Sequence, residues 1–139
     1  MSDNKYWVGF SLIPAIGQVK FSLLEKYFGN LENAWRANAS DLRAAGLDSK
    51  SVSTIVAKRP LISPDAEMQK LEHYKVKVLT WNDSDYPPRL KEIYDRPPVL
   101  YVRGSLAKQD ERAVAVVGTR RASAYGRQVA EEMATDLAR

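Results

Sequence analysis

The sequence predicts a small all-helical domain over residues 1–60, followed by the first part of an α/β domain with a parallel sheet over residues 61–139. Short amphipathic segments separated by brief interruptions fill the first part, and apolar β-forming runs alternate with helical segments in the second. The length of 139 residues suits one compact domain of ordinary size or two small ones.

Five short helices are predicted before residue 60. In residues 5–13 and 18–28 apolar side chains recur at helical spacing, and Gly29 offers a left-handed stop after the second run. The next three helices begin at polar side chains that can accept hydrogen bonds from first-turn amides. These N-caps are expected to be Asn30, Ser40 and either Asp48 or Ser49.

A helix is predicted after Ser63, because Pro64 suits the first helical position. Two strands follow at residues 76–81 and 99–104, separated by a turn-rich stretch and a short helix. Aromatic residues lie at the strand ends and beside prolines, where we expect core or hinge packing rather than stacking on bases. These residues are Trp81, Tyr86, Tyr94 and Tyr101.

The stretch AVAVVG, residues 113–118, predicts a third strand. Its apolar run has no polar face, which is typical of a strand buried on both sides in a parallel sheet. Ser123 then caps a helix with apolar residues every fourth position. The alternation of strand and helix favours a doubly wound α/β architecture.

The turn after this strand has the features of an anion site. Gly118 permits a sharp turn below a helix whose first amides are unpaired, and the helix dipole favours negative charge there. Arg120 and Arg121 add two guanidinium groups suited to phosphate. The alternative, a tight βα turn with solvated arginines, stays open on these grounds, and Arg120 is the better candidate of the two.

Other common sites are disfavoured by the residues present. The glycines at 118 and 126 do not form G-x-G-x-x-G, and the P-loop pattern is absent, so we expect no dinucleotide cofactor. With no cysteine and a single histidine we expect no metal site and no nucleophilic triad. The sequence therefore predicts no cofactor and no catalytic residues.

The turn Pro14-Ala15-Ile16-Gly17 resembles the hairpin of helix-hairpin-helix folds, in which turn amides contact a nucleic-acid phosphate. Weak DNA contact through Gly17, Gln18 and Lys20 is one interpretation. Packing or partner docking by the helical segment is the other. The net charge of +4 fits nucleic-acid binding without requiring it. No segment has the apolar length of a membrane span, so the expected location is the cytoplasm.

Two longer segments resemble the bacterial DNA-processing protein A family, DprA or Smf. They are DYPPRLKEIYDRPPVLYVRG, residues 85–104, and VAVVGTRRASAYGRQVAEEMATDLA, residues 114–138. The resemblance implies a SAM-like or helix-hairpin-helix domain at residues 1–60, followed by the first part of an extended Rossmann-like domain at residues 61–139. It also implies a non-enzymatic protein that binds single-stranded DNA, protects it during natural transformation and loads the recombinase RecA onto it.

The same resemblance implies the phosphate-binding residues Gly118, Thr119, Arg120, Arg121, Ser123 and Gly126. Because family members continue for about another domain, we expect this chain to be the N-terminal portion of such a protein, whose full-length form is a homo-oligomer. Two alternatives stay open. A Rossmann-like nucleoside-phosphate hydrolase also places a glycine–arginine turn on phosphate, and residues 1–60 could serve only as a protein-interaction module.

Overall fold

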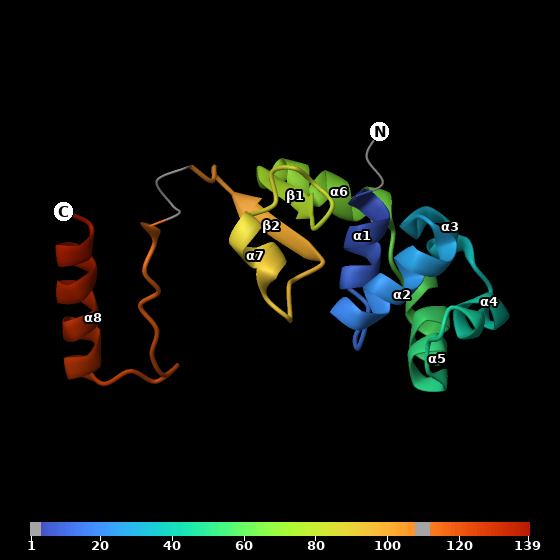
Figure 1. The fold of residues 1–139 in the computed structure, drawn as a ribbon, viewed down its shortest axis with the longest axis horizontal. Coiled ribbons are helices and arrows are strands. Elements are labelled where there is room, and N and C mark those ends of the chain that lie inside the picture. The colour runs from blue at the N-terminus through green and yellow to red at the C-terminus, as the bar shows by residue number, and fades with distance from the viewer. Residues whose placement is uncertain (1–3, 108–111) are drawn as a thin grey trace. The chain divides into compact units, whose positions relative to one another are not determined.

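The computed structural model describes residues 4–107 and 112–139 (Figure 1). It divides into two compact units, Met1–Ser105 and Leu106–Arg139. The first unit holds six longer helices, a short 3-10 helix, a one-turn helix and two strands. In order these are α1 (Asn4–Ser11), α2 (Gln18–Phe28), α3 (Leu31–Arg36), α4 (Ala39–Ala44), α5 (Ser49–Lys58), η1 (Arg59–Leu61), α6 (Pro64–His73), β1 (Val76–Thr80), α7 (Pro88–Glu92) and β2 (Val99–Arg103). The second unit holds α8 (Ala124–Leu137).

Helix α1 is central to the first unit, because it packs against α3, α6 and both strands. Phe10 of α1 is fully buried and meets Trp35 edge to face, with ring centroids 5.0 Å apart. Gly9 permits this close packing, since a Cβ there would lie 2.8 Å from the Trp35 ring. The first helix therefore forms the middle of the core rather than one side of it.

The core extends across residue 60. Trp81, which follows β1, is buried and packs its ring edge to face against Trp7 of α1, with centroids 5.5 Å apart. Tyr86 and Val99 belong to the same buried cluster. The domain boundary expected after residue 60 stays a prediction, while the side chains on either side of it share one core.

Most predicted helix starts are confirmed. Asn30 caps α3, Asp48 caps α5 and Ser63 caps α6, each through a side-chain oxygen that accepts a first-turn amide. The prediction of Ser40 as the next N-cap is wrong. Helix α4 begins at Ala39, and the Asn38 side chain accepts the amide of Asp41 at 3.0 Å.

Replacing Asn38 by alanine should lower the free energy of unfolding by about 0.5–2 kcal/mol, because the Asp41 amide loses its acceptor. Ser40→Ala is the matched control. It should change stability by less than about 0.5 kcal/mol, since Ser40 is an exposed residue one position inside the helix. Urea denaturation measures both variants, and equal losses would contradict the assignment of Asn38.

The sheet differs from the sequence-based expectation in two ways. Strands β1 and β2 pair antiparallel, with Val78 opposite Tyr101. Residues 113–118 form no strand, and Val117 is 88% exposed. An extended segment becomes a strand only by hydrogen bonding to a neighbouring strand, and the described residues of the second unit provide none. The Rossmann-like parallel sheet therefore stays a prediction.

Candidate nucleic-acid interface

The predicted anion turn leads directly into α8. Arg120 and Arg121 form a turn after Gly118 and Thr119, and Ser123 is the N-cap of the helix. The Ser123 hydroxyl oxygen accepts the backbone N–H of Gly126 at 3.1 Å, as the sequence predicts. This cap gives α8 a defined start three residues after the first arginine.

Both arginines of this turn are exposed. Within residues 4–107 and 112–139 neither guanidinium makes an ion pair or hydrogen bond, and the backbone amides of Ala124 and Tyr125 also have no acceptor. Helix N-terminal amides carry partial positive charge. Two unpaired cations thus lie beside a helix start, an arrangement that suits a phosphate group.

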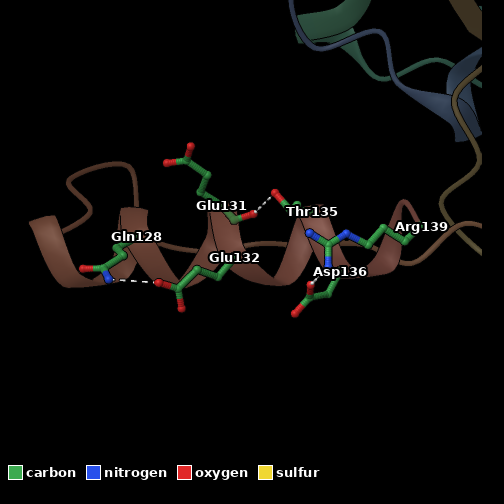
Figure 2. A pocket seen from close by; sticks show the side chains of 6 residues that line it. All are labelled: Gln128, Glu131, Glu132, Thr135, Asp136 and Arg139. Atoms are coloured by element: carbon green, nitrogen blue, oxygen red, sulfur yellow. Dashed lines mark hydrogen bonds and ion pairs between the residues drawn. The ribbon is translucent and has the colours of Figure 1, made fainter.

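A shallow polar hollow farther along α8 is lined by more acidic than basic side chains (Figure 2). Its side chains are largely engaged with one another: Gln128 Nε2 donates to Glu132 at 2.9 Å, and Arg139 pairs with Asp136 at 3.5 Å. With Glu131 as well, the lining contains three carboxylates and one arginine. The carboxylates of this hollow would repel phosphate, so a phosphate site on α8 is expected only at its N-terminal end.

The second predicted DNA contact, Gly17, Gln18 and Lys20, lies at the start of α2. Gly17 is the N-cap, with no side chain to accept an amide. The Lys20 ammonium is already engaged, because it donates to the Ala15 carbonyl at 2.8 Å and lies 3.3 Å from an Asp48 carboxylate oxygen. A phosphate would have to compete with both groups, so DNA contact through this lysine stays a prediction.

Asp48 is well suited to hold Lys20. The pKa of its carboxyl is lowered, chiefly because the Ser51 hydroxyl donates to it at 2.6 Å, then because the Ser51 amide donates at 2.9 Å, with Lys20 adding a smaller effect. The carboxylate therefore keeps its negative charge well into acid. It ties the start of α5 to the α1–α2 turn, where Ala15 has a left-handed φ of 68°.

A shallow, open cavity of about 490 Å³ lies at the surface beside the same turn. The α1–α2 turn and the start of α2 form one part of its lining, and Tyr94 and Asp95, from the loop between α7 and β2, form the other. Residues 94 and 95 are far from Gly17 in the sequence, and no local pattern connects them. Sequence reasoning therefore missed this cavity.

The aromatic residues near the strands divide into two groups. Trp81 and Tyr86 are buried, at 7% and 1% exposure, which confirms the expected core packing. That expectation is wrong for Tyr94, which is 89% exposed and does not belong to the core cluster. Tyr101 is 46% exposed, and its hydroxyl lies 2.7 Å from that of Ser11.

Neither a metal-binding cluster nor a membrane-spanning helix occurs in the described part of the chain. No cluster of three or more histidine, cysteine, aspartate or glutamate side chains there could hold a metal ion. None of the described helices combines the length and apolar character needed to cross a membrane.

Comparison with known proteins relates the chain to DNA processing. The DNA recombination-mediator protein A family matches residues 77–139. The protein Smf of Synechocystis sp. is 32% identical over 130 residues, which is 90% of this chain and 33% of that protein. The DNA processing protein DprA of Bacillus subtilis is 34% identical over 65 residues, 46% of this chain and 22% of that protein. No solved structure gives a significant match.

The chain thus spans about a third of the length of the Smf protein that it resembles. The matched segment, residues 77–139, includes all of β1 except Val76, and also β2, the arginine turn and α8. The match to Smf extends to 90% of the chain, well beyond that segment. Together these matches make the chain similar to the DprA/Smf family of DNA-processing proteins, through the family model over residues 77–139 and the Smf protein over 90% of the chain.

Proposed function

We propose that this chain acts in DNA processing as part of a non-enzymatic protein that binds single-stranded DNA, protects it during natural transformation and loads RecA. The observation that carries the proposal is the pair Arg120 and Arg121 at the capped start of α8, neither of which has a partner among the described residues. The family description as a recombination mediator and the relative named a DNA processing protein support the same role.

The proposed phosphate site is formed by Gly118, Thr119, Arg120, Arg121, Ser123 and Gly126. Ser123 accepts the Gly126 amide with its hydroxyl oxygen and so defines the helix start, while its hydroxyl proton can still be donated to a phosphate. The arginines supply the charge and the α8 amides supply donors. In the parent protein we propose that residues 113–118 become a strand of a Rossmann-like parallel sheet, in a homo-oligomer of the cytoplasm.

Arg120→Ala should weaken binding of an oligodeoxythymidylate by about 1–3 kcal/mol, because a charge-assisted phosphate contact is lost. The dependence of log K on log salt should also become shallower by roughly 0.7, the counterion release of one single-strand phosphate. Fluorescence anisotropy at several salt concentrations, on the full-length parent and on this chain, measures both quantities.

Arg43→Ala is the control, because it removes the same charge from an exposed position on α4. It should leave both the affinity and the salt slope of the parent close to their original values. Arg120→Ala binding as tightly as the unmodified protein would refute the site. Turnover of nucleoside monophosphates by the parent would instead favour the hydrolase alternative.

A further inference from the structure

The cavity beside the α1–α2 turn is lined by an aromatic side chain, Tyr94, that has no partner among the described residues. Tyr94 is 89% exposed, the highest value among the exposed large hydrophobic residues of the described chain. Its ring packs against no other described ring, and its hydroxyl makes no hydrogen bond to a described residue. Large aromatic side chains are costly to leave in water, and an exposed one that lines a cavity offers a surface for stacking.

The other groups that line this cavity suit a flat heterocycle better than a phosphate. Val19, 61% exposed, adds apolar surface. The Gln18 side chain, which has no partner among the described residues, offers both a donor and an acceptor. The carboxylate of Asp95 repels phosphate but can accept from an exocyclic amino group. The volume of about 490 Å³ lies within the range for small-ligand sites.

We propose that this cavity receives one base of a single DNA strand, stacked on the ring of Tyr94, with Gln18 and Asp95 at the edge of the base. This inference rests on the proposed function for its ligand. It adds a contact that lies wholly in the first unit and does not use the arginine turn. Lys20 stays paired with Asp48 and Ala15, so stacking rather than charge supplies the affinity at this position.

The test measures binding of a fluorescent oligodeoxycytidylate to the whole chain and its variants by anisotropy. Tyr94→Ala should weaken binding about fivefold or more, because loss of one stacked base lowers affinity by that amount at least. Tyr94→Phe keeps the ring and should retain the affinity. Tyr74→Ala is the matched control, since Tyr74 is also an exposed tyrosine of the first unit, 65% exposed, and does not line the cavity.

A second readout locates the contact. An oligonucleotide carrying 5-bromodeoxycytidine should crosslink to Tyr94 on irradiation and not to Tyr74. Folding of Tyr94→Ala is verified by thermal unfolding, which an exposed side chain should leave nearly unchanged.

The results for Tyr94→Ala test the stacking site, and the result for Arg120→Ala tests the proposed function. Unchanged affinity of Tyr94→Ala, or no crosslink at Tyr94, overturns the stacking site, while loss of affinity in Arg120→Ala keeps the proposed function. Loss in Tyr94→Ala alone supports the stacking site and counts against Arg120. If the unmodified chain does not bind the oligonucleotide, the inference is overturned, since the cavity is complete within it, and the Arg120 site is then judged on the full-length parent.

Discussion

Phe10→Ala should lower the free energy of unfolding by about 3–5 kcal/mol. Phe10 is fully buried on α1, and its ring contacts Phe21 of α2 and Trp35 of α3, with centroids at 6.2 Å and 5.0 Å. Truncation removes these ring contacts and leaves a cavity at the meeting point of three helices. The interior is close-packed, so the neighbours can fill only part of that space.

Urea denaturation followed by far-UV circular dichroism measures this loss. Leu61→Ala is the matched control, because Leu61 is 78% exposed and its truncation should change stability by less than about 0.5 kcal/mol. A loss below roughly 1 kcal/mol for Phe10→Ala would contradict the central position of α1 in the core.

Trp81→Ala should destabilise the whole first unit, by about 3–5 kcal/mol, in one transition. The Trp81 ring packs against Trp7 and Phe21, at 5.5 Å and 6.3 Å, and its Nε1 donates to Glu25 at 3.1 Å. The Arg96 guanidinium lies over the same ring at 5.0 Å. Trp81 therefore connects the helices before residue 60 with the strands after it.

Two probes followed in urea test this connection. In Trp81→Ala the fluorescence of Trp7 and Trp35 reports on the helices, while in the unmodified protein Trp81 also contributes; circular dichroism reports on the whole chain. Coincident transitions are expected for Trp81→Ala and for the unmodified protein. Trp81→Phe keeps an aromatic ring and should lose less stability. A variant whose helices unfold at the original urea concentration would show that residues 1–60 are stable independently of the sheet.

Local structure in this protein was largely predictable from the sequence. Helix α2 has the predicted bounds, Gln18 to Phe28, and Gly29 ends it with the left-handed φ of 77°. Ser63 and Ser123 cap their helices as expected. These features depend on neighbouring residues only, since an N-cap or a glycine stop satisfies backbone groups within one turn. The error at Ser40 arose because Asn38, two residues earlier, caps equally well.

The state of residues 113–118, which form no strand in this structure, and the exposure of Tyr94 could not be predicted in the same way. Whether an apolar run becomes a strand depends on a hydrogen-bonding neighbour, and whether an aromatic ring is buried depends on what packs over it. Tyr86 and Tyr94 both lie near prolines between the same two strands, yet one is 1% and the other 89% exposed.

The arginine turn could be predicted from the sequence, whereas the contacts around the α1–α2 turn could not. Residues 118–126 are contiguous, so composition and capping were enough to predict an arginine turn at the start of a helix. The state of Lys20 was not predictable, because its partner Asp48 lies on another helix. Likewise, only the folded chain brings Tyr94 and Asp95 beside Gly17. Short-range hydrogen bonding thus follows from the order of the residues, whereas pairing of charges and exposure of rings follow from which distant segments pack together.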